Sequence, residues 1–432
     1  MNESLTNDGQ VPQAGAKNGM FRSLHIPNFR RYYLGQLISL NGTWMHSVAQ
    51  AWLVYRLTGS SFMLGLVTFC NLAPVLLLSL VAGVAADRFN RRKMLIAVHS
   101  FAMLQALLLA ALTITDTVEP WHIVVLATVL GAARAFEVPA RHALIGEIIP
   151  REQLSNAIGL SSSTFNAARF VGPAIAGALV AWWGEGPVFL VNALSFSAIL
   201  FALIGMRLEK RPNDAAGEPI GAHLIEGLRF AAGHAQIRGG LLMLGMVSMM
   251  SSAITVLMPV FAAETHAGGS QLMGVMMSAM GAGALLGALR LAARPSGEGL
   301  ERVIGWAAFG LAVAACVFST LHVLWLTLPV LVLVGYGHTT AAASANAMIQ
   351  LHTDDALRGR VMSIFSMIFL GLMPVGSLLG GWAAEHVGAS ATITSFGLAC
   401  GLASSLYLWS LYKPARADRQ SASVGGQSHV NR

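Results

Sequence analysis

Twelve long apolar runs, separated by short polar loops, are the feature that most limits the folds open to this sequence. An α-helix rises 1.5 Å per residue, so about 20 apolar residues span the hydrocarbon core of a bilayer. The runs cover residues 32–57, 62–86, 94–115, 120–145, 156–183, 187–207, 238–262, 271–293, 302–320, 323–350, 359–385 and 390–412. With 55% hydrophobic and 11% charged residues, the chain is too apolar for a soluble protein of 432 residues. We therefore predict an all-α membrane protein with twelve transmembrane helices.

The charged residues predict how these helices are oriented. If the N-terminus is cytosolic, all 27 Lys and Arg residues except Arg56, Arg134 and Arg169 fall on the cytosolic side. The loops on the opposite side carry acidic residues: Asp116, Glu119, Glu185, Glu264 and Glu385. Basic loops remain in the cytosol during membrane insertion. We therefore expect both termini to be cytoplasmic, and we assign the positive charge to membrane topology rather than to nucleic-acid binding.

The longest connection, residues 208–237, divides the runs into two sets of six. We expect six-helix bundles at 21–207 and 238–412, joined by this cytosolic linker, with disordered cytosolic tails at 1–20 and 413–432. Within the linker, apolar residues recur at helical spacing: Leu224, Ile225, Leu228 and Phe230. This pattern fits an interfacial helix, and a merely solvated linker is the alternative.

The two halves also repeat each other. A shift of 204 residues places Phe165 on Phe369, and it aligns these glycines: Gly131 with Gly335, Gly172 with Gly376, Gly177 with Gly381, Gly184 with Gly388. A shift of 209 places Gly65 on Gly274. Repeated halves related by an axis along the membrane normal are typical of facilitator-type transporters, so we predict two pseudo-symmetric bundles.

A basic loop joins the second and third runs and reads G-x-x-x-D-R-x-x-R-R. It resembles the signature loop between helices 2 and 3 of the major facilitator superfamily, with Asn90 where the family usually has glycine. An ordinary positive-inside stop signal is the alternative. We expect a cytosolic latch between the halves from five residues of this loop: Gly83, Asp87, Arg88, Arg91 and Arg92.

The fifth run carries a second resemblance. Gly159, Gly172, Pro173 and Gly177 occupy positions of the superfamily's helix-5 antiporter motif, G-x8-G-x3-G-P-x2-G-G, in which this chain has alanine at two of the glycines. Small residues and a proline predict a closely packed, bendable helix. The resemblance implies export rather than uptake.

Further segments are similar to the transmembrane-secretion-effector branch of the superfamily, which includes the enterobactin exporter and macrolide efflux proteins. They are residues 42–60, 139–141, 166–169, 358–363 and 376–381, and the similarity extends over about 21–412. It implies a major facilitator fold in the bacterial inner membrane that works by alternating access. It does not name a substrate.

Three charged residues lie deep within predicted helices. Arg134 is about 13 residues, or roughly 20 Å, beyond Trp121, and Glu137 follows on the same helix face. Arg169 is similarly deep in the fifth run. Such charges cost about 3 kcal/mol or more without a partner or a wet cavity, and they are usually functional. Arg134 also resembles the superfamily's helix-4 arginine. We expect Arg134 to pair with Glu137 and Arg169 to meet Glu137 or line a cavity, and we expect all three to couple protons, with a structural ion pair as the alternative.

Polar side chains on two other helices predict a substrate cavity. One stripe on the first run contains Thr43, His46 and Gln50, and one on the tenth contains Thr339, Asn346 and Gln350, to which we add Asn166 of the fifth run. His46 fits either a hydrogen-bonded packing histidine or a proton carrier.

The sequence contains no ATP-binding loop, no H-E-x-x-H and no paired C-x-x-C, so we expect no enzyme activity, cofactor or metal. Ion gradients must then supply the energy. We predict a monomeric proton antiporter that exports a small amphipathic molecule, such as a siderophore or a drug-like compound. An uptake or facilitated-diffusion permease and a transport-inactive sensor or assembly partner are the alternatives.

Overall fold

The computed structural model describes residues 21–206, 229–294 and 298–427, without the side chains of residues 80, 84, 87, 355, 356 and 413–427. Its long helices are α1 (Pro27–Thr58), α2 (Ser61–Arg88), α3 (Arg91–Ile114), α4 (Pro120–Ile148), α5 (Arg151–Trp183), α6 (Glu185–Ile204), α8 (Ala235–Val256), α10 (Ser270–Ala292), α11 (Leu300–Thr320), α12 (Leu324–Leu351), α13 (Asp355–Val387) and α14 (Ala389–Gln427). Three short elements complete this list: η1 (Arg22–His25), α9 (Met258–Val260) and η2 (Phe261–Thr265).

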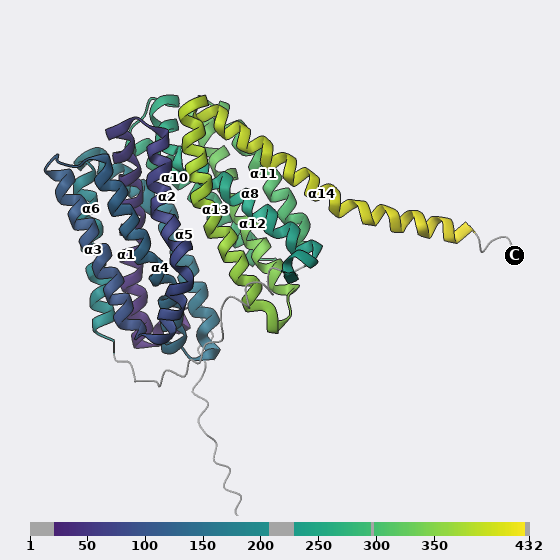
Figure 1. Ribbon diagram of the computed structural model, residues 1–432, viewed down its shortest axis with the longest axis horizontal. Coiled ribbons are helices and arrows are strands. Elements are labelled where there is room, and N and C mark those ends of the chain that lie inside the picture. The colour runs from purple at the N-terminus through teal and green to yellow at the C-terminus, as the bar shows by residue number, and fades with distance from the viewer. Residues whose placement is uncertain (1–20, 207–228, 295–297, 428–432) are drawn as a thin grey trace, which may run out of the picture.

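Helices α1–α6 form one bundle and α8–α14 form a second (Figure 1). Among the described residues, eleven helices are long and apolar enough to cross a membrane. The remaining long helix, α1, falls outside this set; polar residues such as Asn41, Thr43 and His46 lie along it. The chain is a multi-pass membrane protein with the predicted two-bundle fold.

Local sequence explains where the first helices begin and end. Gly59 adopts a left-handed conformation with φ of 58°, which ends α1 without the steric penalty of a Cβ atom. The Ser60 hydroxyl accepts a hydrogen bond from the Met63 amide and caps α2. Asn90 caps α3 by accepting from the Lys93 amide at 3.0 Å. This cap gives a structural reason for asparagine where the resembling loop usually has glycine.

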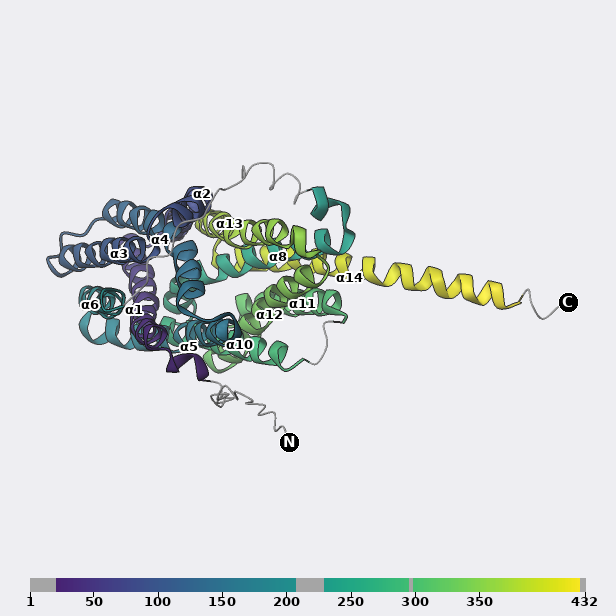
Figure 2. The same ribbon diagram turned by 90° about the horizontal axis from the view of Figure 1, so that it is seen from below.

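We call the end of the bundles that carries Asp116, Glu119, Glu185, Glu264 and Glu385 the acidic end, and the end at the α2–α3 loop the basic end. Two helix pairs make most of the contact between the bundles, α2 with α13 and α5 with α10 (Figure 2). In Figure 1 the bundles meet at the acidic end and diverge toward the basic end.

Glycines permit the close contact between the bundles. A Cβ atom at Gly65 would lie 2.6 Å from the Ser377 carbonyl oxygen and 3.1 Å from Cα of Gly381. At Gly177 it would lie 2.5 Å from the Ser270 carbonyl oxygen and 3.0 Å from Cα of Gly274. The two contacts are equivalent under the shifts that align the halves, which confirms the predicted pseudo-symmetry. Side chains at these positions would force the helices apart.

Hydrogen bonds between the bundles also lie at the acidic end. Tyr55 Oη donates to Glu264 Oε1 at 3.0 Å, and Glu385 Oε2 accepts from the Ser60 hydroxyl and the Phe62 amide, both at 3.1 Å. The protein is therefore closed at the acidic end.

At the basic end, by contrast, three glycines of the two bundles have open space beside them. A Cβ atom at Gly83, Gly159 or Gly359 would meet no described atom within 4 Å. We predicted Gly83 as part of a latch between the halves and Gly159 as part of a closely packed helix, and in this conformation neither glycine has a described neighbour at its Cβ position. The physical reason is the separation of the two bundles at this end.

The structure describes the predicted linker and tails only in part. The N-terminal tail 1–20 and most of the linker 208–237, with most of its possible interfacial helix, lie outside the described residues. By contrast, α14 continues to Gln427 and projects from its bundle (Figure 1), so a helix occupies most of the expected disordered tail at 413–432. Alanine, arginine and glutamine in this segment favour helix formation.

Candidate transport site

Arg134 lies at the middle of α4 and faces α2. Its Nη1 donates to Oδ1 of Asn71 at 3.2 Å. Gly131, one turn earlier, makes this approach possible, because a Cβ atom there would overlap the Asn71 carbonyl oxygen. The sequence predicted Glu137 as the partner of Arg134, and this pairing is not the one that forms. The amide of Asn71 orients the guanidinium without cancelling its charge.

Glu137 instead pairs with Arg141, one helical turn further on. Arg141 Nη1 lies 3.2 Å from Glu137 Oε1, in the i,i+4 geometry of a helix. Arg134 and His99 of α3 also act electrostatically on this carboxylate. His99 is buried, and its Nε2 has no hydrogen-bond partner among the described residues. A histidine within the third apolar run was the signal for this contact, and the sequence reasoning missed it.

Arg169 of α5 faces the second bundle. It is half-buried, forms no hydrogen bond or ion pair with any described residue, and interacts electrostatically with His338 of α12. The His338 side chain is 5% exposed and stacks on Phe369 of α13, with 6.2 Å between ring centroids. Of the two arrangements predicted for Arg169, a contact with Glu137 or a position lining a cavity, the contact with Glu137 does not form, because Glu137 pairs with Arg141. The second bundle supplies an aromatic and imidazole surface instead.

Aromatic side chains accompany the cations. Trp44 of α1 meets Phe165 of α5 edge to face at 5.7 Å. Gly172 makes room for Trp44, because a Cβ atom at this glycine would lie 2.7 Å from Cβ of Trp44. The 204-residue shift relates Phe165 to Phe369 and also Arg134 to His338. The two halves thus place an aromatic ring and a basic group at equivalent positions.

The residues of the predicted polar stripes lie in two different environments. His46 is 2% exposed, and its Nε2 lies 3.0 Å from Gln50 Oε1, with Phe189 of α6 against its ring. This places His46 and Gln50 in the interior of the first bundle and corrects our expectation that they face a substrate. Thr43 donates to the Ser39 carbonyl within α1.

The remaining predicted cavity residues, Asn166, Thr339, Asn346 and Gln350, are less buried than His46 and Gln50. Asn166 is half-buried and donates to the Ser162 carbonyl, and Gln350 donates to Asn346 at 2.5 Å. The Thr339 hydroxyl has no hydrogen-bond partner among the described residues. Asn166 and Thr339 therefore retain polar atoms that a ligand can use.

The basic loop makes contacts within its own bundle. Arg91 Nη1 lies 3.2 Å from Glu147 Oε2 of α4, and Arg92 donates to the Ile204 carbonyl of α6. The side chain of Asp87, the acidic member of the predicted latch, lies outside the described residues. Arg88 has a partner of its own. The latch across the halves stays a prediction for another conformation.

Two six-helix bundles, with basic and aromatic side chains where they face each other, define a membrane transporter of the major facilitator superfamily. The model of one family, transmembrane secretion effector, matches residues 18–426. The chain belongs to this family, and it is a transporter rather than an enzyme.

Three relatives illustrate the family. The staphyloferrin A transporter of Staphylococcus aureus is 26% identical over 372 residues, which cover 85% of this chain and 92% of that protein. The multidrug efflux pump Tap of Mycolicibacterium fortuitum is 27% identical over 81% of this chain and 88% of its own length. The enterobactin exporter EntS of Citrobacter koseri is 26% identical over 86% and 89%.

A solved structure supports the fold. The bacterial homologue of the human lysosomal transporter Spinster, in an inward-facing and occupied conformation, superposes with a TM-score of 0.67. The match covers 90% of this chain and 97% of the other, at 15% sequence identity.

Proposed function

We propose that this protein exports a small anionic amphipathic molecule by proton antiport, through alternating access of a site between the two bundles. The observation that carries the proposal is Arg169, a half-buried cation in the middle of a membrane helix with no carboxylate partner among the described residues. A charge at that depth is unfavourable unless an anion or water meets it.

The neighbouring side chains favour an organic anion. Glu137 is engaged by Arg141 and does not neutralise Arg169, and Arg134 keeps its own positive charge beside the neutral amide of Asn71. Trp44 and Phe165 add an aromatic surface on the same bundle. Guanidinium groups bind carboxylates through charge-assisted hydrogen bonds, while aromatic rings take the apolar part of a ligand. A carboxylate-bearing siderophore or an acidic drug-like compound has both features.

Glu137 is the proposed proton carrier. It lies within α4, and Arg141, Arg134 and His99 all act on its carboxylate. Protonation of Glu137 changes the charge of this cluster, so its proton can be coupled to the conformational cycle. Antiport requires that the protein move cargo outward with Glu137 ionised and return without cargo with Glu137 protonated.

We assign the basic end to the cytosol, as the positive-inside rule predicts. The described contacts then belong to a conformation closed to the outside and open to the cytosol. An exporter loads its cargo in this conformation.

The cargo proposal predicts the effect of changing Arg169. Arg169→Gln should weaken binding of a carboxylate cargo about tenfold or more, since a charged hydrogen bond contributes about 1.5 kcal/mol or more. Arg169→Lys should keep most of the affinity because it keeps the charge. Binding can be measured by scintillation proximity with a labelled carboxylate siderophore. Arg151→Gln, an exposed residue of the same helix, is the control, and equal losses in both variants would refute the role of Arg169.

The latch proposal predicts the effect of changing Asp87. In the conformation closed to the cytosol, its carboxylate should accept hydrogen bonds from the other half, worth about 1–3 kcal/mol. Asp87→Asn should shift the equilibrium toward the cytosol-open form by roughly tenfold to a hundredfold, slow transport and leave cargo binding nearly unchanged. Cysteine-accessibility labelling at both ends measures this shift. Unchanged labelling at the basic end would reduce the loop to a topology signal.

A further inference from the structure

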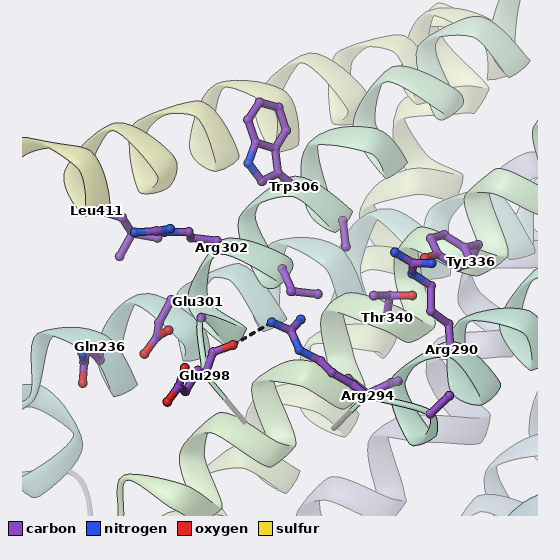
Figure 3. A pocket seen from close by; sticks show the side chains of 15 residues that line it. Gln236, Arg290, Arg294, Glu298, Glu301, Arg302, Trp306, Tyr336, Thr340 and Leu411 are labelled. Atoms are coloured by element: carbon purple, nitrogen blue, oxygen red, sulfur yellow. Dashed lines mark hydrogen bonds between the residues drawn. The ribbon is translucent and has the colours of Figure 1, made fainter. Parts of the chain in front are cut away.

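A cavity lies away from the proposed transport site, at the basic end of the C-terminal bundle. It has a volume of about 1180 Å³ and is lined by residues of α8, α10, α11, α12 and α14. Figure 3 shows three arginines around it, Arg290, Arg294 and Arg302, with Trp306 beside them. The proposed transport mechanism uses none of these residues.

Within the part of the chain that the structure describes, the three arginines form no ion pair with a carboxylate. Arg294 Nη2 donates to the backbone carbonyl of Glu298 at 2.6 Å, and the Arg302 guanidinium lies 5.6 Å from the centre of the Tyr412 ring. Arg290 has no hydrogen bond or ion pair with a described residue. The Glu301 carboxylate lies 3.7 Å from His352 instead. The guanidinium groups therefore remain available to an anion.

One polar atom in the wall of the cavity is also unused. Thr340 lines the cavity and is only 5% exposed, and its hydroxyl has no hydrogen-bond partner among the described residues. A buried hydroxyl without a partner is unfavourable. A ligand or a water molecule in the cavity can satisfy it.

The surroundings indicate where the anion comes from. Trp306 is 55% exposed beside the arginines, and on α10 the side chain of Leu289, next to Arg290, is 58% exposed. An exposed tryptophan next to arginines is typical of the headgroup level of a membrane. The cavity thus lies where lipid headgroups are found.

We propose that this cavity binds the headgroup of an anionic phospholipid. Arginine matches the geometry of phosphate oxygens, and basic pockets between helices at a membrane surface bind anionic headgroups. Three arginines in a cavity of this size suit two phosphates better than one, so cardiolipin should bind more tightly than phosphatidylglycerol. A free phosphate ion offers the arginines the same oxygen atoms as a lipid headgroup, but it does not use the adjoining apolar surface.

The test is lipid binding to the purified full-length protein in detergent, measured by native mass spectrometry. The probes are cardiolipin, phosphatidylglycerol, phosphatidylcholine and inorganic phosphate. The variant carries Arg290→Gln, Arg294→Gln and Arg302→Gln together, and Arg30→Gln, an exposed residue of the first bundle, is the control. We expect cardiolipin to bind at least about tenfold more tightly than phosphatidylcholine, and the triple variant to lose about tenfold or more of that affinity. The control should stay within about twofold of the unmodified protein.

Three results would overturn the proposal: equal affinity for cardiolipin and phosphatidylcholine, equal loss in the triple variant and in the control, or displacement of the lipid by millimolar inorganic phosphate. The last result would assign the cavity to free phosphate. If the triple variant does not fold, as judged by its unfolding temperature without added lipid, the single change Arg294→Gln replaces it. Cardiolipin should then raise the unfolding temperature of the unmodified protein more than that of this variant.

Discussion

Glu137→Gln should abolish gradient-driven export and leave exchange of cargo across the membrane. Glutamine keeps the size and polarity of the side chain but cannot bind and release a proton. Exchange requires only that the loaded protein change conformation, whereas net export requires the return of a protonated carrier. We expect active efflux to fall by a factor of about 100 or more, as for the loss of an essential proton-transfer group. Efflux and counterflow in vesicles, measured on the same preparation, separate the two activities.

A second carboxylate on the same helix provides the matched control. Glu147 pairs with Arg91 at 3.2 Å near the end of α4, away from the Glu137 cluster. Glu147→Gln removes an ion pair of similar length outside the proposed proton site, so it should change efflux and counterflow to the same extent. If Glu137→Gln instead lost efflux and counterflow equally, Glu137 would be a structural partner of Arg141 and not the proton carrier.

Gly177→Ala should destabilise the conformation that is closed at the acidic end and impair transport. The added methyl group would lie 2.5 Å from the Ser270 carbonyl oxygen, which belongs to the backbone of α10 and cannot rotate away. Overpacking of this kind costs about 1–3 kcal/mol, which corresponds to a shift of roughly tenfold to a hundredfold between two states. The open state should gain what the closed state loses, because these helices separate when the acidic end opens.

Gly159→Ala on the same helix should have little effect on this conformation, because no described atom lies within 4 Å of the new Cβ. Thr117 and Ser390 are exposed at the acidic end of the two bundles and can carry spin labels. Pulsed electron paramagnetic resonance would report the opening as a longer distance between the two labels. The three native cysteines are first replaced by serine. Identical distance distributions for Gly177→Ala and the unmodified protein would show that the glycine contact does not control closure.

The fold followed from the sequence because its determinants are local or repeated. Apolar runs of bilayer length predicted the helices, and the 204- and 209-residue shifts predicted which glycines occupy equivalent places. Gly65 with Gly381 and Gly274 with Gly177 form the corresponding contacts. Periodicity could not show that α14 continues as a helix to Gln427, because that segment is polar and gives no burial signal.

The site was predicted less completely, since its partners come from different helices. Depth in the membrane identified Arg134, Glu137 and Arg169 as unusual, but helical spacing did not distinguish Arg134 from Arg141 as the partner of Glu137. Asn71 and His99 come from α2 and α3, and only the folded structure brings them near α4.

The stripe on α1 shows a related limit. Periodicity identifies residues that share a helix face, but it does not say which neighbour that face meets. His46 and Gln50 share a face and pack beside α6, so they contribute to the interior of the bundle. The structure is needed to separate such a face from one that lines a cavity.

Proton movement driven by cargo tests the central claim most directly. Purified protein is reconstituted into vesicles containing a pH-sensitive dye, a pH gradient is imposed, and a carboxylate siderophore is added on the side of the basic end. Proton-coupled export predicts that the cargo dissipates the gradient, that Arg169→Gln and Glu137→Gln both prevent this, and that an ionophore stops cargo accumulation. Cargo transport that continues at the same rate and extent after the gradient is collapsed, with no proton movement, would contradict antiport and indicate facilitated diffusion.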